Sequence, residues 1–221
     1  TSEGTTLNCI GLIYTYLGNY SQALDYYQQA LAIRREVKAR ADEGTTLYNI
    51  GGTYKELGDY SQALSYYQQA LVIIREVTAR AEEGTILNSI GGAYYQLNSY
   101  SQALDHHQQA LAISREVRDR AGEGSALSNI GVTYGQLGDY SQDLDYSQQA
   151  LVIKREIGDR KGESTALNNI GLAYSNLGNY SRALNYYQQA LALKREVKDR
   201  AGEGKTLSNI GLLLDKIQET E

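Results

Sequence analysis

Apolar residues along the chain follow helical spacing, and the pattern repeats every 40 residues. Within residues 44–80, a first stripe consists of Leu47, Ile50, Gly51, Tyr54 and Leu57. A second, longer stripe consists of Tyr60, Ala63, Leu64, Tyr67, Ala70, Leu71, Ile73 and Val77. Spacings of three, four and seven residues place the members of each stripe on one side of an α-helix. The pattern predicts a first helix and a longer second helix in every repeat.

The segment between the two stripes, residues 57–62, combines a helix stop with a helix start. Gly58 suits the left-handed conformation that ends many helices. Asp59 is the predicted N-cap of the second helix, and Gln62 completes a capping box. In the third repeat Asn98 replaces the glycine, and Asn tolerates a left-handed backbone better than most residues. The N-cap position varies only among residues that cap well: Asn19, Asp59, Ser99, Asp139 and Asn179.

The copies stay in register without insertions, so no boundary or linker divides the array. Gln-Gln-Ala-Leu recurs at 28–31, 68–71, 108–111, 148–151 and 188–191. One hairpin is too small to bury its apolar stripes alone, so neighbouring hairpins must stack into an elongated solenoid. We predict a single repeat domain over residues 1–221. Its units are 1–40, 41–80, 81–120, 121–160 and 161–200, followed by a C-terminal capping helix, 201–221.

Charge and composition exclude several classes of protein. Lys and Arg number 21 against 26 Asp and Glu, a net charge of -5, which argues against a nucleic-acid partner. The apolar runs are far shorter than the roughly 18 residues that a membrane span needs, so no membrane association is expected. One cysteine cannot form an internal disulfide, which excludes a small secreted domain held together by disulfides. We expect a cytoplasmic location. The missing initiator Met suggests a fragment or a processed chain.

The repeat resembles the tetratricopeptide repeat family, whose pattern is W-x2-L-G-x2-Y, then A-x3-F, then P. In the second unit the matching residues are Leu47, Ile50, Gly51, Tyr54, Ala63 and Tyr67. The final Pro position falls on Arg75, so the second helix is expected to continue, which accounts for 40 residues instead of 34. This longer form is similar to the repeats of kinesin light chain and of bacterial arrays. The resemblance implies an all-α, right-handed superhelical solenoid of antiparallel helix hairpins, with five full repeats and a C-terminal half repeat.

The resemblance also implies a module that binds a protein or peptide in a concave groove lined by the first helix of each repeat. Two adjacent columns of residues fall on that face. Asn fills most of one column, which consists of Cys9, Asn49, Ser89, Asn129, Asn169 and Asn209, and the adjacent column would supply side-chain discrimination. An Asn side chain carries donors and an acceptor, so it can bridge the N–H and C=O groups of an extended peptide. The alternatives are that these residues tie one repeat to the next or are simply solvated. The predicted peptide-binding residues are Asn49, Asn129, Asn169, Asn209, Asn8, Tyr48, Asn88, Asn168, Lys55 and Tyr95.

Three functional hypotheses remain distinct, because a fold does not identify a ligand. The first is a scaffold for a peptide segment or protein partner. The second is a self-associating structural array that joins end to end, and the third is a regulatory or sensor arm of a larger multidomain signalling protein. Catalysis is not expected, because no nucleophile has a base and an orienting group at plausible spacing. No cofactor or metal is expected, since the adjacent His106 and His107 point in different directions on a helix.

Two further features carry expectations about stability. Asp143 replaces a small core Ala and Ser147 replaces a core Tyr, so a buried carboxylate without a partner should make the fourth unit the weakest. Amide hydrogen exchange should therefore be faster in residues 130–157 than in 170–197. Arg75, Glu76, Arg80 and Glu83 recur in every copy and are expected to form solvated ion pairs, each worth a few tenths of a kcal/mol.

Overall fold

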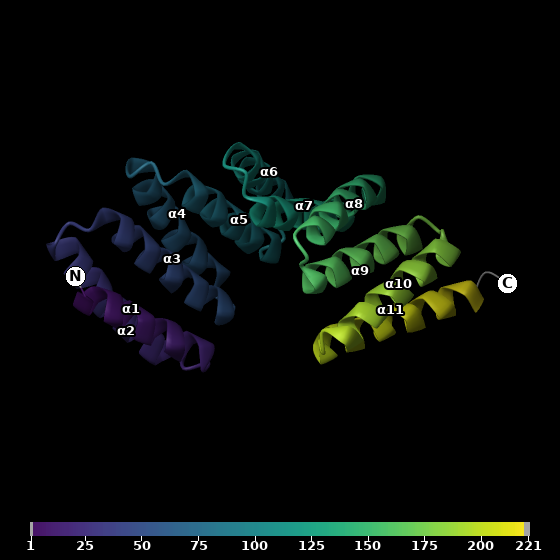
Figure 1. The fold of residues 1–221 in the computed structure, drawn as a ribbon, viewed down its shortest axis with the longest axis horizontal. Coiled ribbons are helices and arrows are strands. Elements are labelled where there is room, and N and C mark those ends of the chain that lie inside the picture. Colours follow the sequence, from purple (N-terminus) through teal and green to yellow (C-terminus); the bar gives the residue numbers. More distant parts are fainter. Residues whose placement is uncertain (1, 219–221) are drawn as a thin grey trace. The chain divides into compact units, whose positions relative to one another are not determined.

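The computed structural model describes residues 2–218, and the described chain is helical from end to end apart from short turns (Figure 1). Its helices are α1 (Ser2–Tyr16), α2 (Tyr20–Glu36), α3 (Arg40–Glu56), α4 (Tyr60–Glu76), α5 (Arg80–Gln96), α6 (Tyr100–Glu116), α7 (Arg120–Gln136), α8 (Tyr140–Glu156), α9 (Arg160–Asn176), α10 (Tyr180–Glu196) and α11 (Arg200–Gln218). Odd-numbered helices are the predicted first helices, and even-numbered helices up to α10 are the second. The expectation of a longer second helix was wrong, because α3 and α4 each have 17 residues. The all-α fold of consecutive hairpins with a 40-residue period is confirmed. The predicted capping helix corresponds to α11, and residues 219–221 lie outside the described residues.

The chain divides into two compact units, residues 1–117 and 118–221. In the first unit, α2 packs against both α1 and α3, and α4 packs against both α3 and α5. In the second unit, α8 packs against α7 and α9, and α10 packs against α9 and α11. A second helix therefore lies between two first helices, which is how each hairpin covers its neighbour's apolar stripe. A single repeat domain over all 221 residues stays a prediction.

The turn inside each hairpin uses a left-handed residue, as the sequence predicts. Gly58 has a φ of 80° and Asn98 a φ of 58°. After α3, the Gly58 N–H donates to the Lys55 carbonyl at 3.0 Å and the Asp59 N–H donates to the Tyr54 carbonyl at 2.9 Å. This pair of bonds is the Schellman motif, and it satisfies carbonyls that the end of a helix would otherwise leave without partners.

The predicted side-chain caps are present in some hairpins only. The Asp59 carboxylate accepts a hydrogen bond from the Gln62 N–H at 3.0 Å, and Asp139 and Asn179 make the equivalent bond. Asn19 and Ser99 make no side-chain cap bond, so the expectation of a cap at every hairpin was wrong. The prediction of a capping box was wrong as well, because the Asp59 N–H already donates to the Tyr54 carbonyl in the Schellman motif.

A second tight turn joins each hairpin to the next, and most of these turns have no glycine at the left-handed position. After α4, the Thr78 N–H donates to the Arg75 carbonyl at 3.2 Å and the Ala79 N–H donates to the Ile74 carbonyl at 3.1 Å. Thr78 has a φ of 55°, a left-handed conformation that a β-branched residue rarely adopts. The backbone bonds are those of another Schellman motif, formed here without glycine.

Tight packing between the helices of a hairpin explains the recurrent Ile-Gly pair. A Cβ on Gly51 would lie 2.6 Å from the ring of Tyr67, so only glycine lets α3 approach α4 this closely. Tyr67 and Ala63 are buried, as the stripes predict. Leu57 and Val77, the last members of their stripes, are instead C-cap residues outside the helices, and Leu57 is 49% exposed.

Asp143 is buried as predicted, with 3% of its surface exposed, but it is not without a partner. The Ser147 hydroxyl donates to Asp143 Oδ1 at 3.0 Å. A Cβ on Gly135 would lie 2.7 Å from Asp143 Oδ2, so the glycine makes room for the carboxylate. The Asp143 and Ser147 substitutions therefore act together with Gly135. Faster hydrogen exchange in this fourth repeat stays a prediction.

Candidate functional site: the face of the first helices

The predicted site residues come from one face of the first helices, at two adjacent positions in each repeat. Asn8, Tyr48, Asn88 and Asn168 form one column, and Asn49, Asn129, Asn169 and Asn209 form the other. All eight side chains are half-buried. Each is thus held by neighbouring residues while part of its surface still faces solvent.

Hydrogen bonds join the first column of one repeat to the second column of the next. Asn49 Nδ2 donates to Asn8 Oδ1 at 3.2 Å, from α3 to α1. The same bond, also 3.2 Å, runs from Asn209 Nδ2 in α11 to Asn168 Oδ1 in α9. In the intervening repeat, the hydroxyls of Tyr48 and Ser89 lie 3.2 Å apart. Partners in each pair are 41 residues apart, so the two columns interlock along each unit.

The remaining predicted residues lie apart from these pairs. Lys55 is exposed at the end of α3 and forms an ion pair with Glu56 at 3.0 Å. Tyr95 contacts the ring of Tyr100 edge to face, with centroids 5.6 Å apart. The amide oxygen of Asn88 lies 2.7 Å from Nδ1 of His107, so Asn88 also reaches into its own hairpin.

Cys9 occupies the Asn column in α1 and is exposed. His107 replaces a core Tyr and is buried, and this burial lowers its pKa to about 4. The neighbouring His106 adds a smaller effect in the same direction. His107 is therefore neutral at pH 7.

A row of buried glutamates at the junctions between hairpins was not expected from the sequence. Glu83 is 7% exposed and accepts hydrogen bonds from Arg75 Nε at 2.7 Å and from Arg80 Nη1 at 2.6 Å. Arg80 also reaches Glu116 at the end of α6, at 2.7 Å. Burial alone would raise the pKa of Glu83, but the two arginine bonds outweigh it and lower that pKa.

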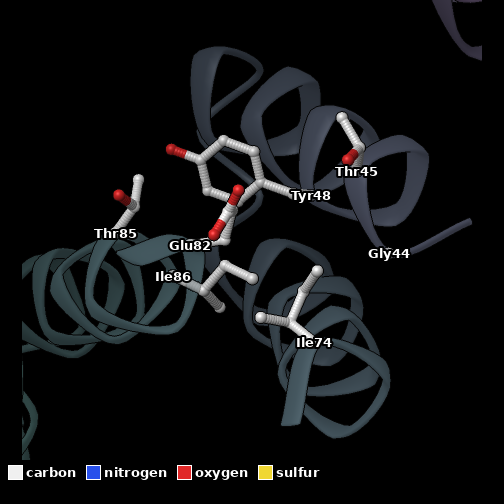
Figure 2. Close-up of a pocket in the computed structure, with 7 residues that line it drawn as sticks. All are labelled: Gly44, Thr45, Tyr48, Ile74, Glu82, Thr85 and Ile86. Atoms are coloured by element: carbon white, nitrogen blue, oxygen red, sulfur yellow. The ribbon is translucent and has the colours of Figure 1, made fainter. Parts of the chain in front are cut away.

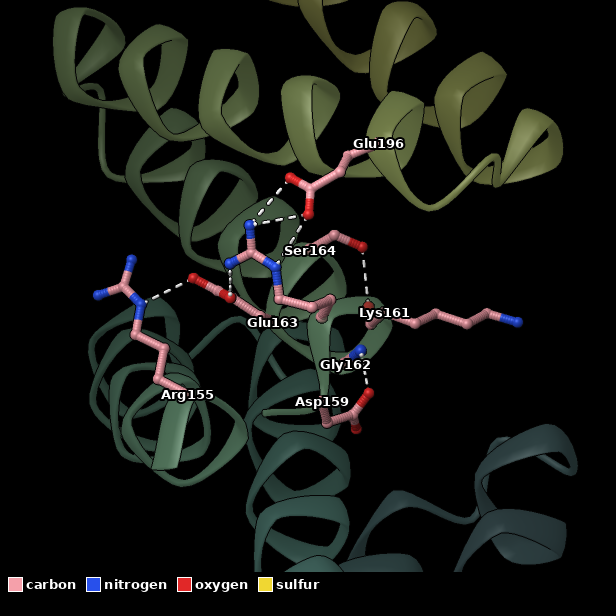
Figure 3. Close-up of polar contacts among 8 residues, drawn as sticks. Arg155, Asp159, Lys161, Gly162, Glu163, Ser164 and Glu196 are labelled. Atoms are coloured by element: carbon pink, nitrogen blue, oxygen red, sulfur yellow. Dashed lines mark hydrogen bonds and ion pairs between the residues drawn. The ribbon is translucent and has the colours of Figure 1, made fainter. Parts of the chain in front are cut away.

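The second compact unit, residues 118–221, contains the same arrangement, which is drawn in Figure 3. Glu163 accepts from Arg155 and Arg160, each at 2.8 Å, and Arg160 pairs with Glu196 at 2.9 Å. These pairs connect three consecutive helices. The expectation of solvated ion pairs was wrong for the glutamate, because Glu163 is buried. The cause is the three-residue turn between hairpins, which brings an arginine at the end of a second helix close to a glutamate eight residues later.

One position in the last turn of the second helices places its side chain between successive first helices, as Arg34 of α2 does between α1 and α3. The residue type at this position varies between repeats. Arg34 Nη1 donates to the Asp42 carbonyl at 2.7 Å and also contacts the Thr46 hydroxyl. Lys194 Nζ donates to the Thr206 hydroxyl at 2.9 Å. The equivalent residue in α4 is Ile74, which cannot make such bonds.

A recess lies at this position between α3, α4 and α5 (Figure 2). Its volume is about 110 Å³, and it is lined mainly by apolar surface. The residues around it are Gly44, Thr45, Tyr48, Ile74, Glu82, Thr85 and Ile86. Tyr48 was the predicted site residue among them. Ile74, Glu82 and Ile86 were missed because helical periodicity within one repeat does not show which residues line a recess between helices of successive repeats.

Comparison with known proteins identifies the fold. The tetratricopeptide repeat family model matches residues 2–76, 82–156, 144–196 and 162–221. No curated protein sequence matches the chain. Among solved structures, the chain is similar to the apo form of RapI, with a TM-score of 0.88 and 20% identity over 96% of this chain and 77% of that chain.

Two further structures show the same likeness. A Rap protein complexed with Competence and Sporulation Factor has a TM-score of 0.80 and 20% identity, over 98% of this chain and 64% of that one. A putative kinesin light chain from Podospora anserina with nearly identical TPR-like repeats has a TM-score of 0.72 and 13% identity, over 88% of this chain and 96% of that one. At these identities the likeness concerns the fold, and the family model supplies the assignment. The chain belongs to the tetratricopeptide repeat family.

Proposed function

We propose that the chain is a protein-interaction scaffold that binds a peptide segment of a partner protein along the face of its first helices. The observation that carries this proposal is the pair of interlocked polar columns, which places half-buried amides at the same position of successive repeats. A side-chain amide offers both donors and an acceptor to a peptide main chain. The family assignment and the Rap complex with a bound factor support a binding role for this kind of fold.

The bonds between columns are compatible with this role and assist it. Asn49 and Asn209 are each fixed by a bond to the preceding first helix, so their rotamers are set before a ligand arrives. A side chain that is already ordered loses less conformational entropy on binding, which favours affinity. The same residues thus link repeats and bind the ligand, and measurements of affinity and of melting temperature on the same variants separate the two roles.

The test is selection of a random decapeptide library on the full chain, followed by affinity measurement on the double variant Asn169→Ala/Asn209→Ala. We expect selected peptides to bind the double variant at least about tenfold more weakly, corresponding to about 1.4 kcal/mol. The matched control is Asn185→Ala, because Asn185 is an exposed Asn of the second helix α10 that bonds Gln189 at 2.6 Å. This control should bind with unchanged affinity.

Thermal unfolding of the same variants separates the two roles. Loss of affinity with a nearly unchanged melting temperature supports a ligand-binding Asn column. A lower melting temperature with retained affinity shows that the column only links repeats. A library that yields no binder for the intact chain would refute the proposed function.

Self-association is a second candidate, favoured by exposed apolar side chains on α1 and α11. Leu212 of α11 is 62% exposed, and Leu12, Tyr16 and Leu17 of α1 or its C-terminal turn are also exposed. Apolar surface of this kind can mark an interaction site. Sedimentation over a hundredfold range of concentration would show a rising mass if copies associate, and a constant monomer mass would exclude this candidate.

A further inference from the structure

The recess between α3, α4 and α5 differs from the equivalent places in other hairpins, because an aliphatic side chain forms its floor. Arg34 and Lys194 occupy the corresponding positions elsewhere and bond to groups on the next first helix. Ile74 makes no polar contact there, and together with Ile86 it leaves an apolar hollow. Both isoleucines are buried, with 2% and 3% exposed.

The dimensions of the recess suit one side chain. Its volume is about 110 Å³, while a cavity of roughly 150 Å³ lined by apolar residues can hold benzene. A branched aliphatic group such as that of Leu, Ile or Val is the matching size. The ring of Tyr48 forms one wall, and Thr45 and Thr85 stand at the sides (Figure 2).

A single carboxylate stands beside this apolar surface. Figure 2 shows the Glu82 carboxylate next to the Tyr48 ring, above Ile86. Among residues 2–218, no Lys or Arg lies within ion-pair distance of Glu82, whereas the adjacent Glu83 is held by Arg75 and Arg80. Asp42 is the equivalent acid in α3, so both first helices around the recess carry an exposed acid at this position.

We propose that this recess receives an aliphatic side chain of the bound peptide, and that an adjacent Lys or Arg of the same peptide pairs with Glu82. The inference rests on the proposed function, since it assigns one contact of that peptide. Burial of the aliphatic side chain supplies most of the affinity, because transfer of apolar surface from water is the larger effect. The exposed carboxylate supplies selectivity for a neighbouring cation and disfavours an acidic peptide.

Two substitutions test the two halves of the contact. Ile74→Lys introduces the residue that α8 and α10 carry at the equivalent position, Lys154 and Lys194, so the fold already accommodates it. Glu82→Gln removes the charge and keeps the side-chain shape. Asp105→Asn, on the exposed surface of α6, is the matched control for loss of one negative charge.

The experiment is selection of the random decapeptide library on the full chain, with wild type and each variant in parallel. Peptides selected by wild type are expected to be enriched in an aliphatic residue next to Lys or Arg. Such peptides should bind Ile74→Lys at least about tenfold more weakly. They should bind Glu82→Gln about threefold more weakly, with the preference for Lys or Arg lost, and the control should match wild type.

A second measurement locates the contact without relying on the variants. Methyl resonances of Ile74 and Ile86 in the wild-type chain should shift on addition of a selected peptide, in proportion to occupancy. Peptides that bind without an aliphatic–basic preference, or that leave these resonances and the affinity of Ile74→Lys unchanged, would overturn the inference and leave the proposed function standing. A library without any binder would overturn both.

Discussion

Asp143 offers the sharpest test of how the fourth repeat is built, because its charge is buried between α7 and α8. Burial raises the pKa of the Asp143 carboxyl to about 6, and the hydrogen bond from Ser147 opposes this effect without cancelling it. In an unfolded segment the same carboxyl has a pKa of about 3.9. Between these two values the folded repeat binds more protons than the unfolded one.

The sign and size of the pH effect follow from this difference. Because the folded state holds the proton more tightly, stability is highest below the unfolded pKa and falls as the pH rises through the folded pKa. A difference of about two pKa units corresponds to about 3 kcal/mol. The repeat should therefore lose about 2 kcal/mol of local stability between pH 4 and pH 7.

The perturbation is Asp143→Asn, which keeps the size of the side chain and removes its titration. The assay is native-state hydrogen exchange of segment 130–157, corrected for the intrinsic pH dependence of amide exchange, with segment 170–197 as internal reference. In wild type we expect 130–157 to be less protected than 170–197 at pH 7, and the difference to shrink by about 2 kcal/mol at pH 4, where the unfolded carboxyl is still partly ionised. In Asp143→Asn the difference between segments should be nearly independent of pH.

Two results would refute this reasoning. Equal protection of both segments in wild type at pH 7 would show that the buried carboxylate does not weaken its repeat. The same pH dependence in wild type and Asp143→Asn would show that another group titrates. Asp143→Ala, which restores the residue that other repeats carry, should also remove the pH dependence.

Three further predictions concern the turns, the core and the junctions. Thr78→Gly should raise the free energy of unfolding by about 0.5–1 kcal/mol, because relief of the left-handed strain exceeds the entropy cost of glycine; a decrease in denaturant titration would contradict it. The buried imidazole of His107 has a depressed pKa of about 4, so wild type should lose up to about 3 kcal/mol of stability as the pH falls from 6.5 towards 4. His107→Tyr should abolish this pH dependence, and hydrogen exchange of α5 and α6 at both pH values measures it. Glu83→Ala should lower the free energy of unfolding by about 1–2 kcal/mol, because two hydrogen bonds from arginines are lost. The exposed control Asp105→Ala should lower it by less than about 0.5 kcal/mol. Equal losses for the two variants in thermal unfolding would argue against a role of Glu83 at the junction.

Much of the fold could be predicted because the relevant signals are local and repeated. Gly58 and Asn98 indicate the turn inside their respective hairpins. The spacing of Leu47 and Ile50 indicates the buried side of a helix. The confirmed hairpins rest on these features. The second turn was missed because Thr78 has no sequence signature for a left-handed backbone: its conformation is imposed by the packing of α4 and α5 on either side.

The candidate site could be predicted only in part, since contacts between repeats are not visible in one repeat. Asn49 is recognisable as a polar residue on the opposite side from the core, but its bond to Asn8 depends on how α3 lies against α1. The buried position of Glu83 likewise follows from the turn geometry and from two arginines on different helices. Periodicity predicts which side of a helix is apolar, whereas a neighbouring hairpin determines which polar residues are covered.

The starts of the first helices show how a residue can be available to a partner without a loss of stability. In α9, Asp159 caps the helix by accepting from the Gly162 N–H at 2.8 Å, and a Cβ on Gly162 would lie 2.3 Å from the Asp159 carboxylate. In α5 the cap position is Ala79, and the residue three positions later is Glu82. An acid in either place is favoured by the positive end of the helix dipole. The acid at Asp159 is used by the backbone of its own helix, whereas at Glu82 it stabilises α5 through the dipole while its carboxylate stands beside the recess.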